Sequence, residues 1–157
     1  HRNMLLWNGG CHVHEQFSIE KIVELKATHP GAKVLAHPEC KSDILKLADV
    51  IGSTAALLSH AQKSDKQQFI IVTESGILHE MQKSCPDKEF IPVPPETTEG
   101  GTTCDCNECN YMRLNTLEKV YNCLRYEFPQ VEVDAEVASK AIKPIERMLE
   151  LSEQLVK

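Results

Sequence analysis

Residues 69–76 read Phe-Ile-Ile-Val-Thr-Glu-Ser-Gly, an unbroken apolar run that changes at once to small polar residues. Four consecutive apolar residues, three of them β-branched, favour a short strand buried on both faces. Amphipathic spacing then resumes, so we predict a strand over residues 69–73 followed by a helix over residues 75–83. This step from strand through polar loop to helix is the unit of the predicted fold.

The same unit recurs along the chain. Apolar runs predict further strands at residues 4–7, 34–36, 50–51 and 90–93, and helical spacing predicts helices at residues 19–29, 44–48 and 53–61. Strands that alternate with helices pair in parallel through right-handed crossovers. We therefore predict an α/β fold, a three-layer αβα sandwich around a parallel sheet.

The pattern changes after the fifth predicted strand. Residues 94–110 form a loop rich in Pro, Thr and Gly that is too long for a simple connection, which favours a functional role. Two amphipathic helices follow, and no further strand follows them. Because the chain also opens on His1 and enters an apolar run by residue 4, we expect a fragment whose N-terminal portion is absent.

Composition excludes several classes of function. The 157 residues carry a formal net charge of -6, and no basic run exceeds two residues, which argues against nucleic-acid and anionic-membrane binding. No apolar stretch reaches the roughly 20 residues of a membrane span. We expect a cytoplasmic protein, or a plastid protein if a transit segment precedes residue 1.

Seven cysteines in an acidic chain favour metal or redox chemistry over a disulfide framework. Cys104, Cys106 and Cys109 form a compact thiolate source suited to zinc or an iron-sulfur cluster. Any remaining ligand would come from Cys11, from a histidine or from outside this chain. Cys85 and Cys123 are predicted to be small buried apolar residues.

Polar motifs follow every predicted strand. In chain order they are Gly9-Gly-Cys-His-Val-His-Glu15, His37-Pro-Glu-Cys40, Gly52-Ser-Thr54, Thr73-Glu-Ser-Gly76 and the cysteine loop. In a parallel sheet all of them lie at the carboxyl edge, where open α/β proteins bind ligands. This convergence predicts a site there.

Two of these motifs suggest particular chemistry. Pro38 holds a rigid turn that allows His37 and Glu39 to face one ligand as a general acid/base pair. Ser53 and Thr54 open a helix and are suited to hold a carboxylate or phosphate, although an ordinary N-cap is the alternative interpretation.

Taken in order, the motifs resemble those of the quinolinate synthase family, and the resemblance covers essentially the whole chain. It runs through Gly10-Cys-His-Val-His14, His37-Pro-Glu-Cys40, Gly52-Ser-Thr54, Thr73-Glu-Ser-Gly-Ile77 and Cys109-Asn-Tyr-Met112. The family builds three αβα sandwiches around a pseudo-threefold axis. The resemblance thus implies that residues 1–13 end the second sandwich, that residues 14–109 form the third, and that residues 110–157 are helices packing on a missing first domain.

The resemblance also implies an activity. The family condenses iminoaspartate with dihydroxyacetone phosphate to quinolinate in de novo NAD biosynthesis, using a 4Fe-4S cluster held by three cysteines, with one open iron. Cys11 and Cys109 correspond to two cluster ligands, and the third is expected upstream of residue 1. His14 would face the active site, His37 and Glu39 would bind the intermediate and move protons, and Ser53 and Thr54 would hold a substrate carboxylate. L-aspartate oxidase is implied as the supplier of iminoaspartate, and a homodimer as the assembly.

Two other interpretations stay open. In one, Cys104, Cys106, Cys109 and one histidine form the zinc site of a non-catalytic structural module. In the other, the chain is an anion-binding α/β domain with an incidental cysteine loop. The first predicts tight zinc binding that is indifferent to His37 and Glu39, and the second predicts that replacing Cys11 has no effect.

Overall fold

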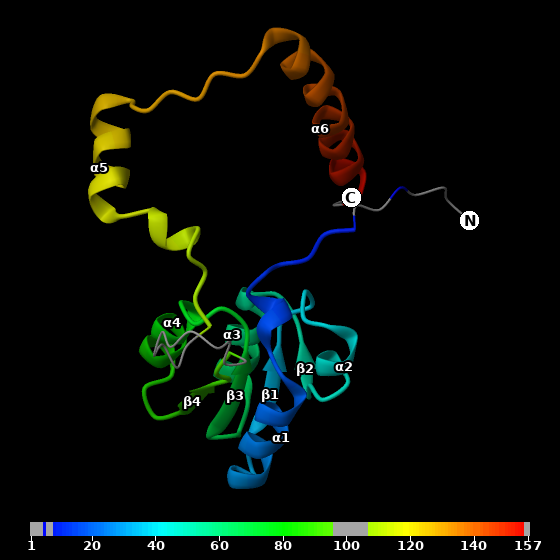
Figure 1. Ribbon diagram of the computed structural model, residues 1–157, viewed down its shortest axis with the longest axis vertical. Coiled ribbons are helices and arrows are strands. Elements are labelled where there is room, and N and C mark those ends of the chain that lie inside the picture. Colours follow the sequence, from blue (N-terminus) through cyan, green and yellow to red (C-terminus); the bar gives the residue numbers. More distant parts are fainter. Residues whose placement is uncertain (1–4, 6–7, 96–106, 156–157) are drawn as a thin grey trace. The chain divides into compact units, whose positions relative to one another are not determined.

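A computed structural model describes residues 5, 8–95 and 107–155 and divides the chain into two compact units, residues 1–112 and 113–157. The first unit contains a four-stranded parallel sheet of order β2-β1-β3-β4 (Figure 1). Its strands are β1 (Lys33–Ala36), β2 (Val50–Ile51), β3 (Gln68–Val72) and β4 (Glu89–Pro92). The predicted strand at residues 4–7 falls outside the described residues, apart from Leu5, which is in no strand.

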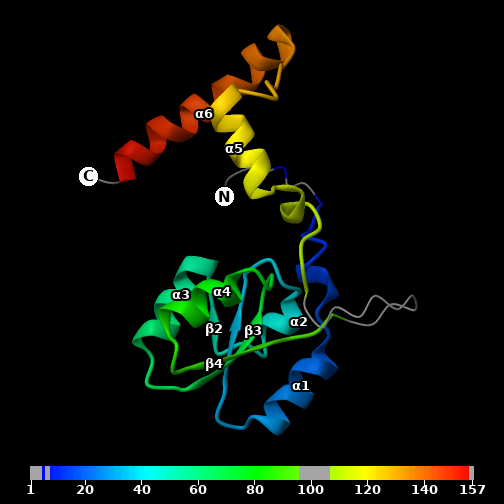
Figure 2. The same cartoon turned by 90° about the vertical axis from the view of Figure 1, so that its left-hand side faces the viewer.

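Helices cover both faces of this sheet, which confirms the predicted αβα sandwich. They are α1 (Ile19–Thr28), α2 (Ser42–Leu45), α3 (Thr54–Lys63) and α4 (Ile77–Ser84). Figure 2 shows α1 and α2 on one side of the strands and α3 and α4 on the other. A short 3-10 helix, η1 (His14–Gln16), precedes α1 and was not predicted.

The alternation of side chains along each strand divides the core in two. Val34, Ala36, Ile70 and Val72 pack with Ile22 of α1 and with α2 on one face. Leu35, Phe69 and Ile71 pack with α3 and α4 on the other. Because both faces are covered, the central strands are apolar at residues 34–36 of β1 and 69–72 of β3 rather than alternating, as expected for a buried parallel sheet.

The helix bounds differ from the predictions by one to three residues, and α3 ends at Lys63 rather than at residue 61. The α2 helix lies over residues 42–45 rather than 44–48, because the chain leaves it through turns in which Leu47 donates to the carbonyl of Ile44. The α4 helix begins at Ile77 rather than at residue 75, because the chain enters it through turns in which Ile77 donates to the Glu74 carbonyl and Leu78 to the Ser75 carbonyl. The amide of Ser75 donates to the Asn107 carbonyl, and that of Gly76 to the Glu74 carboxylate.

The second unit consists of helices, as predicted. It contains α5 (Leu117–Tyr126) and α6 (Ala135–Leu155), which follow the 3-10 helix η2 (Met112–Leu114). Their apolar stripes are exposed in the described residues, and the predicted packing on a missing domain stays a prediction. Cys123 lies on α5 and is exposed, so the prediction that it is buried was wrong, whereas that for Cys85 is confirmed. Among the described residues, no helix is both long and apolar enough to cross a lipid bilayer.

Candidate active site

The strand order creates a switch point between β1 and β3. The chain runs from β1 outward to β2 and then returns to place β3 on the other side of β1. The loops after these two strands therefore diverge at their carboxyl ends, the position at which doubly wound sheets bind ligands. Residues 37–40 and 73–76 are these two loops.

His14 lies at this switch point although it comes from η1, ahead of the sheet. Its side chain is buried, and its Nε2 lies 3.0 Å from the hydroxyl of Thr73 in the loop after β3. Its Nδ1 lies 3.3 Å from the Glu39 carboxylate in the loop after β1. One imidazole thus bridges both loops of the switch point.

His37 and Glu39 lie together, as the rigid turn at Pro38 predicted. The Glu39 carboxylate is 3.7 Å from His37 Nδ1, and the imidazoles of His37 and His14 stack with their centroids 4.6 Å apart. The Glu39 amide N–H donates to His37 Nδ1 at 3.3 Å. This bond assigns Nδ1 as an acceptor and leaves Nε2 to carry the proton of the neutral ring.

The surroundings of His14 lower the pKa of its imidazole below the ordinary 6.5. Desolvation by burial is the largest cause and the neighbouring His37 is the next, while Glu39 and Glu74 oppose the change. Burial likewise raises the pKa of the Cys40 thiol to about 11. Cys40 donates to the Val72 carbonyl and is therefore a structural thiol.

Two contacts bring the loops of Cys11 and Cys109 together. The side-chain amide of Asn107 is buried and donates to the Val13 carbonyl at 2.8 Å. On the other side, the rings of His12 and Tyr111 meet edge to face at 5.3 Å. Each contact joins a residue within two positions of Cys11 to a residue within two positions of Cys109. Both cysteines are partly exposed.

The Glu74 carboxylate holds the backbone of two loops, the one that carries Cys109 and its own. Its Oε1 accepts the amide N–H of Cys109 at 3.2 Å, and its Oε2 accepts that of Gly76 at 2.7 Å. One carboxylate therefore ties Cys109 to the loop after β3. Cys104 and Cys106 lie outside the described residues.

Ser53 and Thr54 lie at the carboxyl end of β2, beside β1. The Ser53 hydroxyl accepts the Ala56 amide N–H at 3.3 Å and caps α3, as the alternative interpretation stated. Both side chains are exposed, and the Ser53 hydroxyl hydrogen stays free to donate to an anion. The cap and the anion site are therefore compatible.

Three residues of this site were missed as contributors by reasoning from sequence: Thr73, Glu74 and Asn107. The first two belong to a loop whose motif was noticed without a role, and its place after the most apolar strand was the available signal. Asn107 lies two residues before Cys109 in a loop for which only the cysteines suggested a role, and nothing in the sequence marked it as buried.

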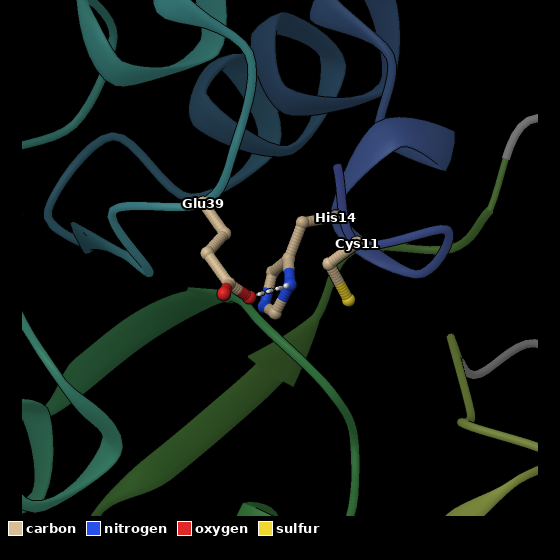
Figure 3. A group of neighbouring side chains, drawn as sticks. All are labelled: Cys11, His14 and Glu39. Atoms are coloured by element: carbon tan, nitrogen blue, oxygen red, sulfur yellow. Dashed lines mark ion pairs between the residues drawn. The ribbon is translucent and has the colours of Figure 1, made fainter. Parts of the chain in front are cut away.

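Cys11, His14 and Glu39 form a group of potential metal ligands among the described residues. One ligand atom from each lies within 4.8 Å of the others. Figure 3 shows Cys11 and His14 on the same loop, with Glu39 reaching His14 from the loop after β1. An open cavity of about 420 Å³, lined by Gly9, Gly10, Cys11 and Glu39, adjoins them.

Comparisons with known proteins agree with the motifs. A family model described as quinolinate synthetase A protein matches residues 1–150. Curated proteins named quinolinate synthase from Chloroherpeton thalassium and Thermosynechococcus vestitus are 56% and 55% identical over 151 residues. One from Cyanophora paradoxa is 52% identical. These alignments cover 96% of this chain and 44–46% of each relative, so the chain spans slightly less than half of their length. As its strand-end motifs predicted, the chain belongs to the quinolinate synthetase A family.

Proposed function

We propose that this chain forms part of a quinolinate synthase, which condenses iminoaspartate with dihydroxyacetone phosphate to quinolinate in NAD biosynthesis. One observation carries the proposal. Two loops that bear Cys11 and Cys109 are joined by direct contacts, and they lie at the same switch point as the cluster of His14, His37 and Glu39. The names of the curated relatives support it.

The two cysteines fit a 4Fe-4S cluster. Thiolates are the ligands that such clusters require. Cys11 and Cys109 are partly exposed and lie on joined loops, whereas Cys40 and Cys85 are buried. We infer that Cys11 and Cys109 supply two ligands and that a third thiolate comes from outside these 157 residues. When bound, a cluster with three protein ligands supplies an open iron position that acts as a Lewis acid.

Glu39 is the acid/base group that substrate would meet. Its carboxylate lines the open cavity and is more than half exposed, while two imidazole nitrogens lie within 4 Å of it. A carboxylate in this position accepts a proton from substrate, becomes a neutral acid, and returns the proton at a later step. His37 offers an Nε2–H as a donor, because its Nδ1 already accepts an amide bond.

The start of α3 is the proposed anion site. Ser53 and Thr54 follow β2, whose carboxyl end lies beside that of β1. The first amides of a helix point outward and attract anions, and hydroxyl groups add donors there. A substrate carboxylate or phosphate held at this point would extend toward His37 and Glu39.

Replacement of Glu39 in the intact synthase tests the proposal. Loss of a general acid/base group lowers kcat by about 10²- to 10⁴-fold, so Glu39→Gln should reduce quinolinate formation by that order while the cluster is retained. Glu20→Gln is the matched control, because Glu20 is an exposed acid in the first turn of α1. Unchanged turnover of Glu39→Gln would refute the role of Glu39.

Cluster ligation needs its own experiment. Anaerobic reconstitution of the intact protein should give the absorption and Mössbauer signals of a 4Fe-4S cluster, and Cys11→Ser should lose them. An undiminished signal in Cys11→Ser would contradict the ligand assignment. A sequence before His1 that contains no cysteine would contradict the three-cysteine cluster itself.

The remaining parts of the proposal rest on family membership alone. They are L-aspartate oxidase as the supplier of iminoaspartate, assembly as a homodimer, and a location in the cytoplasm or plastid. The alternative of a structural zinc module built on Cys104, Cys106 and Cys109 is not favoured by the family match.

A further inference from the structure

His14 has an unusual set of partners for a buried histidine. Its side chain is 7% exposed, and its Nε2 is held by Thr73. Its Nδ1 is buried and makes no hydrogen bond of regular geometry among the described residues, and the group nearest to it is the Glu39 carboxylate at 3.3 Å. A buried ring nitrogen without a partner costs free energy, and a cation between it and the carboxylate removes that cost.

The spacing of the ligand atoms matches that of a tetrahedral metal ion. With zinc–ligand bonds of about 2.0–2.1 Å, two nitrogen or oxygen ligands of one ion lie about 3.3–3.4 Å apart. His14 Nδ1 and Glu39 Oε2 are 3.3 Å apart. The Cys11 sulfur belongs to the same group, whose ligand atoms all lie within 4.8 Å of one another, and closing to the roughly 3.5 Å of a zinc-bound sulfur requires a shift of about 1.3 Å or less.

The surroundings favour the same ligand set. Metal-bound histidines usually donate their other ring N–H to an oxygen, which orients the ring, and Thr73 accepts from Nε2 in that arrangement. His37 is excluded as a ligand through Nδ1, since that nitrogen accepts the Glu39 amide bond. Sulfur, imidazole and carboxylate together suit Zn²⁺ rather than Mg²⁺ or Ca²⁺, which prefer oxygen ligands alone.

We propose that Cys11, His14 and Glu39 bind a single Zn²⁺ ion when no cluster is present. The adjoining cavity gives the ion a path from solvent and leaves its fourth position to water. This inference goes beyond the proposed function and does not require it. Because the cluster would use Cys11 as well, the two metal centres exclude each other.

Cobalt is the probe for the test, since Co²⁺ takes the same ligands and reports its coordination by absorption. The cluster-free 157-residue chain should bind one Co²⁺ with a sulfur-to-metal charge-transfer band and four-coordinate visible bands, and one equivalent of Zn²⁺ should displace it. Cys11→Ser should lose the charge-transfer band. Glu39→Gln, at an exposed position that folding tolerates, should weaken binding by at least the roughly 10-fold that loss of an outer partner costs.

The controls separate this site from others. Glu20→Gln and Cys123→Ser replace exposed groups outside it and should leave the spectrum and affinity unchanged. A triple variant, Cys104→Ser with Cys106→Ser and Cys109→Ser, should also bind normally. Loss of binding in the triple variant would assign the metal to the cysteine loop and overturn the proposal, as would an unaltered affinity in Glu39→Gln. Thr73→Val should weaken binding by about 10- to 100-fold if Thr73 orients the ring.

Discussion

Asn107 is the residue whose replacement tests how the two cysteine loops are joined. Its buried side-chain amide donates a 2.8 Å hydrogen bond to the Val13 carbonyl, two residues beyond Cys11. The backbone carbonyl of Asn107 accepts the Ser75 amide N–H at 3.1 Å, and this bond does not depend on the side chain at position 107. Substitution therefore removes the side-chain contact alone.

The structure sets the expected magnitude. In Asn107→Ala the Val13 carbonyl keeps a weaker bond from the Gln16 amide at 3.3 Å, so it is not left without a donor. The loss is then that of one net hydrogen bond, about 0.5–1.5 kcal/mol, or roughly 2- to 12-fold in the equilibrium for opening of the loop. Asn107→Asp places a buried carboxylate against a carbonyl oxygen and should cost more than Asn107→Ala.

Hydrogen exchange of the Ser75 and Cys109 amides measures this opening in the cluster-free chain, provided that exchange reports the opening equilibrium. Both amides should exchange faster in Asn107→Ala and faster still in Asn107→Asp. Alkylation of the Cys109 thiol should follow the same order. Asn110→Ala, at an exposed position in the same loop, should match the unmodified chain. Equal exchange in the Asn107 and Asn110 variants, or an Asp variant as protected as the original, would refute the reasoning.

Three further predictions concern the sheet unit and its surroundings. Cys40 is buried, its pKa is raised to about 11, and its thiol donates to a β3 carbonyl. At pH 8 iodoacetamide should therefore modify the exposed Cys123 well before Cys40, and peptide mass mapping measures the order. Lys88 donates two 2.6 Å hydrogen bonds to carbonyls at the end of α3. In a urea titration, Lys88→Ala should lower the free energy of unfolding by about 1.5–3 kcal/mol. The control, Lys83→Ala at an exposed position, should lower it by about 0.5 kcal/mol or less. Phe69 is fully buried, so Phe69→Ala should lower the free energy of unfolding by about 3–5 kcal/mol. A loss below about 1 kcal/mol would contradict the place of Phe69 in the core.

The fold followed from local patterns because the two central strands, β1 and β3, are buried on both faces. An apolar run of four or five residues has few other stable environments, and β1 and β3 were predicted to within one residue. The parallel direction followed from the helices between the strands, since a parallel return requires a crossover. The boundaries of α2 and α4 did not follow, because they depend on turn hydrogen bonds and on contacts with residues as distant as Asn107.

The sequence by itself determined the αβα sandwich, the family and the chemical types at the strand ends, because periodicity and motif order are local properties of the chain. Only the tertiary structure decided which groups meet. His14 reaches Thr73 across 59 positions and Glu39 across 25, and Asn107 reaches Val13 across 94. These contacts depend on the strand order that places β1 beside β3, and a hydrogen bond between distant loops leaves no periodic signal in the residues that form it.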